Sequence, residues 1–75
     1  MYEYRYNNQN ITLDILLKIE NTVRILSERQ KKSYDECLLS FYRTNTFKAL
    51  KNPQTCMWSE TAAFIADEYF REKSA

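Results

Sequence analysis

The chain has 75 residues, of which 44% are hydrophobic and 28% are charged, and its net charge is +1. This length gives one small domain with a marginal core, and the composition is too apolar for a disordered chain and too polar for a membrane protein. No apolar stretch approaches the roughly 20 residues that cross a bilayer, and no secretory signal opens the sequence. We therefore expect a cytoplasmic protein without membrane contact, and one that gains stability from a partner or from self-association.

Several residue types are missing, and their absence excludes whole classes of chemistry. The sequence contains no histidine, which removes Ser-His-Asp and Cys-His catalysis and histidine-ligated metals. It contains no glycine, which removes phosphate-binding glycine loops and the easiest left-handed turn for a tight hairpin. Cys37 and Cys56 are too far apart for a CxxC motif, and we interpret both as small buried hydrophobic residues. The sequence thus predicts no catalytic, cofactor-binding or metal-binding residues, and we expect the protein not to be an enzyme.

Residues 1–10 are predicted to form an extended arm. Tyr2, Tyr4 and Tyr6 alternate with polar residues, which is typical of a strand, and residues 7–10 then form a polar break. A short strand and a partly disordered tail are both compatible with this pattern. A strand here would need a second edge from a twin subunit or a partner, because a lone strand is not stable in water. The three tyrosines have no obvious core to join, so we predict that they bind a partner.

The first helix is expected from about Thr12 to between Ser27 and Gln30. Thr12 is the predicted cap, with Ile11 as a hydrophobic staple residue and Asp14 in the first turn. Apolar residues then recur at spacings of three and four, which predicts one buried stripe. The predicted stripe consists of Ile15, Leu16, Ile19, Val23 and Leu26, widened by Leu13, Leu17 and Ile25.

Two further helices are expected before the single proline. Ser33 and Glu36 form a capping box, so a second helix should run to about Arg43, with Cys37, Leu38, Phe41 and Tyr42 as its buried face. Residues 44–46 should interrupt it, because their side chains compete for backbone hydrogen bonds. Thr46 is then predicted to cap a short helix over residues 47–51, which Pro53 terminates.

The last helix is predicted to follow a loop over residues 53–58. Ser59 is its expected cap, and Ala62, Ile65, Ala66, Tyr69 and Phe70 are its apolar stripe, with Phe64 nearby. The expected fold is therefore all-α. It is a small bundle of three main helices and one short helix, with the arm at residues 1–10 and a single helical domain at residues 11–75.

Trp58 and a basic stretch are the remaining candidate sites. Trp58 is either an exposed anchor for a partner or a lid over the core, and we carry it with the tyrosines as a partner-binding candidate. Residues 24–51 contain seven Lys or Arg and three Asp or Glu, a net charge of +4. Arg43, Lys48 and Lys51 lie in this stretch and are able to contact phosphate. Surface solubility is the favoured role, so nucleic acid is the less favoured partner.

Residues 40–72 resemble a group of short, uncharacterised, all-helical bacterial proteins. The shared positions are Phe41, Thr46, Leu50, Trp58, Tyr69 and Glu72. The pattern is a helix ending in an aromatic residue, a short helix with leucine, a loop with an aromatic residue, and a last helix closing on tyrosine and glutamate. Such proteins occur in gene pairs of toxin-antitoxin or mobile-element type. The resemblance implies a neutralising or scaffolding role. The chain departs from the pattern at Cys56, where members tend to place glycine.

Two functions follow from the sequence as hypotheses. The first is a small protein-binding module, antitoxin-like or inhibitory, which binds a protein partner or a second copy through Tyr2, Tyr4, Tyr6 and Trp58. The alternative is a dimeric DNA-binding regulator of ribbon-helix-helix type, because a short strand followed by two helices is that order of elements. In that alternative, Arg5 and Asn7 read the DNA.

Overall fold

The computed structural model describes residues 4–74, and helices dominate them. The fold class is confirmed, since three main helices and one short helix account for most of the chain. A small hairpin comes first and two 3-10 turns precede the last helix. In chain order the elements are β1 (Arg5–Tyr6), β2 (Gln9–Asn10), α1 (Thr12–Gln30), α2 (Tyr34–Tyr42), α3 (Asn45–Leu50), η1 (Pro53–Thr55), η2 (Met57–Ser59) and α4 (Ala62–Ser74).

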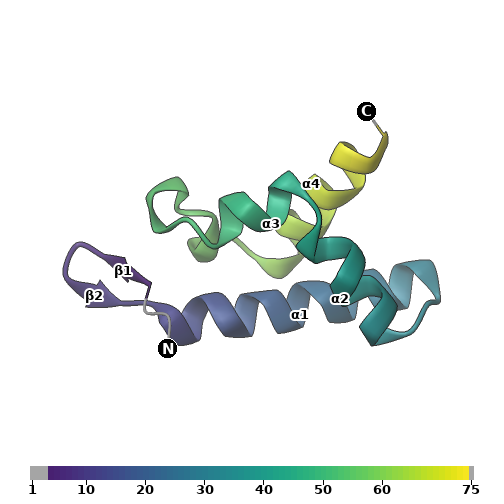
Figure 1. The fold of residues 1–75 in the computed structure, drawn as a ribbon, viewed down its shortest axis with the longest axis horizontal. Coiled ribbons are helices and arrows are strands. Elements are labelled where there is room, and N and C mark those ends of the chain that lie inside the picture. Colours follow the sequence, from purple (N-terminus) through teal and green to yellow (C-terminus); the bar gives the residue numbers. More distant parts are fainter. Residues whose placement is uncertain (1–3, 75) are drawn as a thin grey trace.

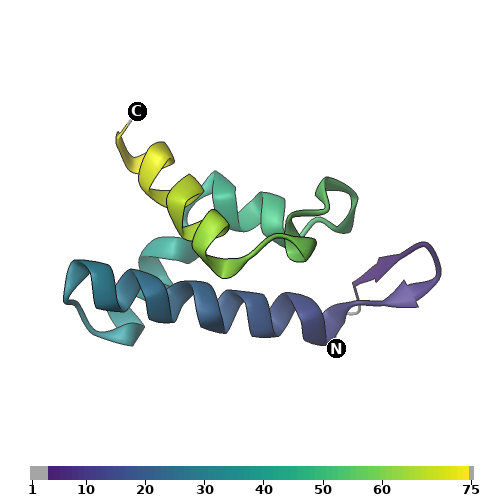
Figure 2. The same cartoon turned by 180° about the vertical axis from the view of Figure 1, so that it is seen from behind.

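The helix α1 packs against α2 and α4, and α3 packs on α2 and α4. In Figure 1, α1 lies along the lower edge with α2 across its near side, and α3 and α4 lie above it. Figure 2 shows α4 from its exposed side, in front of α3. The hairpin and the two 3-10 turns lie at the same end of the molecule, beside the start of α1. The core forms where the four helices meet, and its fully buried residues include Val23, Leu26, Phe41, Leu50, Ile65 and Tyr69.

The local signals locate the second helix correctly. The Ser33 hydroxyl accepts a hydrogen bond from the Glu36 N–H at 3.2 Å and lies 3.3 Å from the Glu36 carboxylate, to which it donates. This confirms Ser33 as the cap. The Glu36 side chain bonds the cap's hydroxyl, whereas a full capping box would bond its backbone amide.

Three other predicted caps are wrong. Thr12 is already inside α1, and its hydroxyl accepts the Tyr4 N–H at 2.8 Å. Thr44, not Thr46, caps α3 by accepting the Phe47 N–H at 3.1 Å. The Ser59 hydroxyl donates to the Cys56 carbonyl within a 3-10 turn, and α4 begins only at Ala62. The errors at Thr46 and Ser59 pick the wrong member of a local group of hydroxyl residues, because neighbouring Ser and Thr residues have similar capping preferences. The cap of α1 is Ile11, which has no side-chain capping bond.

The predicted apolar faces are too wide. Leu13, Leu16 and Leu17 are exposed in the structure, although the stripe of α1 was expected to bury them. Tyr42 of α2 is also exposed, and so is Phe64 of α4. The reason is geometric: neighbouring elements cover only one side of each helix, so the apolar residues beyond that side stay in water.

The N-terminal arm folds back on itself as a hairpin. Asn7 and Asn8 both have positive φ, 50° and 66°, which is the pattern of a type I′ turn. Asparagine tolerates this conformation, so the hairpin forms without glycine. The strands pair in antiparallel register, with Tyr6 opposite Gln9. The strand at Tyr6 therefore finds its second edge within its own chain.

The hairpin is also joined to the start of α1. The Ile11 N–H donates to the Tyr4 carbonyl at 2.7 Å, beside the Tyr4 bond to Thr12. Tyr2, the first of the three predicted binding tyrosines, lies outside the described residues. Within residues 4–74, no helix has the length and apolar character needed to cross a membrane.

Candidate partner-binding surface

An exposed leucine face runs along the N-terminal half of α1. Leu13, Leu16 and Leu17 are 67%, 53% and 48% exposed. Their spacing of three and four residues puts them on one side of the helix, away from the buried Ile15. We call these three residues the leucine face. The sequence shows the residues, but it does not show that no other element covers them.

Trp58 lies at the edge of this face. It lines a shallow cleft with Leu17 and Lys18 of α1. Its indole N–H donates to the Pro53 carbonyl at 3.1 Å, and its ring is partly buried against the core. Trp58 therefore covers one end of the core while part of its ring remains accessible beside Leu17.

Tyr6 contacts Trp58 directly. The two rings meet edge to face with their centroids 5.6 Å apart. The Tyr6 hydroxyl also lies against the Cys56 thiol, and the hydrogen bond and charge of Cys56 raise the pKa of Tyr6. Cys56 is only partly buried, unlike Cys37, and both thiols are free. The structure thus brings together two of the predicted binding residues, Tyr6 and Trp58, and their role in binding a partner stays a prediction.

Tyr4 lies apart from that pair. It lines an open cleft together with Lys48, Lys51 and Asn52, at the C-terminal end of α3. We call this the lysine cleft. The two residues of the DNA-binding alternative are in the hairpin: Arg5 is an exposed residue of β1, and Asn7 is in the turn.

Two aromatic rings, from α2 and α3, lie beside the lysine cleft. The rings of Tyr42 and Phe47 are 4.7 Å apart, and the Lys51 ammonium lies 5.2 Å from the centre of the Phe47 ring. At the start of α2, partial burial raises the pKa of Tyr34, and the nearby charges of Glu20 and Tyr42 raise it further.

The carboxylate of Glu72 holds the first turn of α3 against α4. It accepts the N–H groups of Asn45 and Thr46, both at 2.8 Å, and the Thr46 hydroxyl at 2.7 Å. Partial burial pushes the pKa of Glu72 upward, but these hydrogen bonds outweigh it, and the net pKa is lowered. Because residues 46 and 72 are distant in sequence, no local signal predicted this contact.

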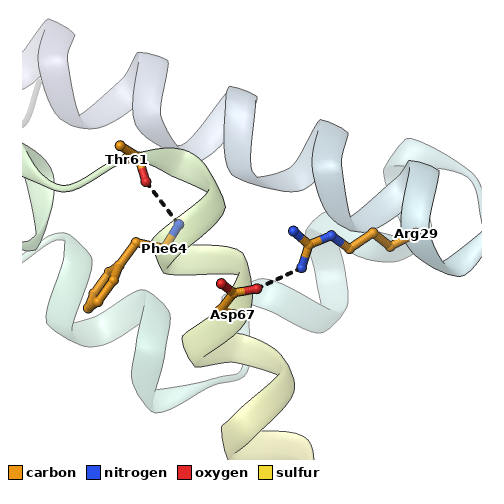
Figure 3. A network of polar contacts seen from close by, with 4 residues as sticks. All are labelled: Arg29, Thr61, Phe64 and Asp67. Carbon is orange, nitrogen blue, oxygen red and sulfur yellow. Dashed lines mark hydrogen bonds and ion pairs between the residues drawn. The ribbon is translucent and has the colours of Figure 1, made fainter.

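Specific contacts join α4 to α1 and cap the start of α4. Figure 3 shows the Arg29 guanidinium of α1 reaching Asp67 of α4, at 2.8 Å. The same guanidinium lies 5.7 Å from the centre of the Phe70 ring. Thr61 caps α4 by accepting the Phe64 N–H at 3.1 Å, and the Phe64 ring points away from α1. The helices are therefore joined by specific contacts, and the exposed leucines are not among the residues that join them.

In the part of the chain that the structure describes, no group of three or more Cys, Asp or Glu residues is arranged to hold a metal ion. Comparison with protein-family models, with curated proteins and with solved structures finds no match to the chain.

Proposed function

We propose that this protein acts by binding a protein partner through the leucine face. One observation carries the proposal: Leu13, Leu16 and Leu17 form a contiguous apolar surface on a long helix and are half to two-thirds exposed. Single exposed leucines are ordinary, whereas a contiguous apolar patch is typical of an interaction site. The spacing suits an apolar helix or groove as the opposing surface.

The free energy that a partner gains by burying these leucines supports binding as the role of the leucine face. Full burial of a leucine side chain is worth about 1.5–3 kcal/mol. Burial of the remaining exposed part of three leucines is therefore a substantial share of the free energy of a typical complex. Trp58 extends the surface at Leu17, which joins the predicted aromatic anchor to the leucine face.

The biological role within this proposal follows from the resemblance stated for residues 40–72. An antitoxin-like or inhibitory protein acts by covering a surface of its partner, and it needs no catalytic residues. The cytoplasmic location and the possible homodimer remain predictions. Identification of the neighbouring gene tests the inhibitory role, because a toxin-like or nuclease-like product is expected there.

The proposal is tested with a tagged chain expressed in its native host. Three chains are compared by affinity purification and quantitative mass spectrometry. They are the wild type, the triple variant L13Q/L16Q/L17Q and the control L39Q, which changes an exposed leucine of α2. We expect a protein that copurifies with the wild type and the control, and whose yield falls about tenfold or more with the triple variant. Equal yields from all three chains, or no copurifying protein, would contradict the proposal.

The DNA-binding alternative has no structural observation in its favour. A ribbon-helix-helix dimer needs the strand of one chain to pair with that of another, but β1 pairs with β2 of the same chain. A gel-shift assay with duplex DNA at low salt addresses it. A shift that Arg5→Ala abolishes would restore this alternative.

A further inference from the structure

The lysine cleft brings two cationic residues, Lys48 and Lys51, next to Tyr4 and Asn52. A cleft lined by two lysines is suited to an anion. Asn52 uses its side-chain oxygen to accept the Gln54 N–H at 3.1 Å, which leaves its amide hydrogens as donors. Among residues 4–74, no carboxylate lies within ion-pair distance of Lys48 or Lys51.

These lysines differ from the arginines of α1 and α4. Arg24, Arg29 and Arg71 each pair with a carboxylate of their own chain. Lysines near the C-terminal end of α3 favour the helix dipole, which accounts for part of their placement. The dipole does not account for Tyr4, which the hairpin brings to the same cleft from a distant part of the sequence.

One of the two cations is already positioned. The Lys51 ammonium lies over the Phe47 ring, so its side chain has less conformational freedom to lose when an anion binds. The Tyr42 ring, against the other part of Phe47, is exposed and apolar. A ligand that fits both features carries negative charge next to an apolar or aromatic group.

We propose that the lysine cleft binds an acidic segment of the partner protein, with Asp or Glu carboxylates at Lys48 and Lys51 and an adjacent apolar side chain on Tyr42 and Phe47. This deepens the proposed function and rests on it, because the segment belongs to the partner. Charge complementarity selects a carboxylate ligand. A nucleic acid is less suited, because its phosphate chain needs many cations, whereas this protein has a net charge of only +1.

The test measures binding of a short synthetic peptide rich in Asp and Glu with one central Trp. The same peptide with Asn and Gln at the acidic positions and a short oligothymidylate are the comparison ligands. Binding is followed by amide chemical shifts of the isotope-labelled full chain. We expect the acidic peptide to bind and to shift the amides around Lys48, Lys51 and Tyr42, with an affinity that falls as salt is added.

Matched variants separate a specific cleft from general attraction. K48Q/K51Q and K31Q/K32Q remove the same charge, the second pair from the connection between α1 and α2. We expect K48Q/K51Q to weaken the acidic peptide about tenfold and K31Q/K32Q to weaken it less than about twofold. Equal weakening by both pairs, no binding of the acidic peptide, or tighter binding of oligothymidylate would each overturn the inference. The triple leucine variant keeps the cleft, so failure of the leucine face and failure of the cleft give different results.

Discussion

The two sides of α1 have different surroundings. On one side, Ile15, Val23 and Leu26 are fully buried, and α2 and α4 pack against this helix. On the other side, Leu13, Leu16 and Leu17 face water. A packed helix buries only the stripe that faces its neighbours, and these leucines lie outside that stripe. Apolar residues that the fold leaves uncovered are available to a partner.

Substitution of a buried aromatic ring should give the largest loss of stability among the variants considered. Phe41 is fully buried and contacts the rings of Phe47 and Tyr69. We expect Phe41→Ala to lower the free energy of unfolding by about 3–5 kcal/mol, because it leaves a cavity among aromatic rings. Leu16→Ala, on the uncovered side of α1, should change it by less than about 1 kcal/mol. Urea denaturation measures both.

If Phe41→Ala prevents folding altogether, Phe41→Leu provides the comparison with a smaller cavity. An equal loss of stability from Phe41→Leu and Leu16→Ala would contradict the exposure assigned to Leu16.

Removal of the Glu72 charge should weaken the attachment of α3 to α4. Glu72→Gln keeps the size of the side chain but loses charge-assisted hydrogen bonds to Asn45 and Thr46. We expect a loss of about 1–3 kcal/mol in the free energy of unfolding, measured by urea denaturation. The control Glu68→Gln removes a carboxylate that pairs with the exposed Arg71, and it should cost less than about 1 kcal/mol. An equal cost for both variants would contradict the role assigned to Glu72.

The hairpin end can be tested with a double-mutant cycle. Tyr6→Ala, Trp58→Ala and the double variant are compared by thermal and urea unfolding. Because the two rings meet edge to face, we expect a coupling free energy of about 0.5–1.5 kcal/mol. Strictly additive effects would mean that Tyr6 does not hold the hairpin against Trp58 in solution.

Acid should lower the free energy of unfolding through protonation of Glu72, with a smaller effect. The pKa of Glu72 is lowered in the folded state, so its stabilising contribution is fully present above its ordinary value of about 4.5. That contribution is lost as the pH falls below this value and through the lowered pKa. We expect the difference in unfolding free energy between wild type and Glu72→Gln to shrink between pH 6 and pH 3, at about constant salt. A difference that stays constant over this range would show that the charge is not involved.

The sequence predicts those features that local patterns determine. The periodicity of α1 and the Ser33 and Glu36 pair each need only neighbouring residues, and the structure has both helices where they were expected. The short α3 was expected too, but its cap was assigned to Thr46. Thr46 instead bonds Glu72, and only the folded chain brings the two together.

The surface was harder to predict because it depends on what covers each helix. The hairpin was missed since Asn7 and Asn8 supply the positive φ that is usually expected of glycine. The leucine face was missed because periodicity shows which residues are apolar and cannot show how wide a side of the helix its neighbours cover. The lysine cleft needs Tyr4 beside α3, a contact between distant parts of the chain.

The most direct test of the leucine face is site-specific photo-crosslinking in the native host. A photoreactive amino acid replaces Leu16 in one chain and Glu28, an exposed residue near the C-terminal end of α1, in another. We predict a discrete crosslinked protein from position 16 that is absent from position 28 and that disappears when Leu13 and Leu17 are both changed to Gln. The same adducts from both positions, or none from position 16, would contradict the claim that the leucine face is the binding surface.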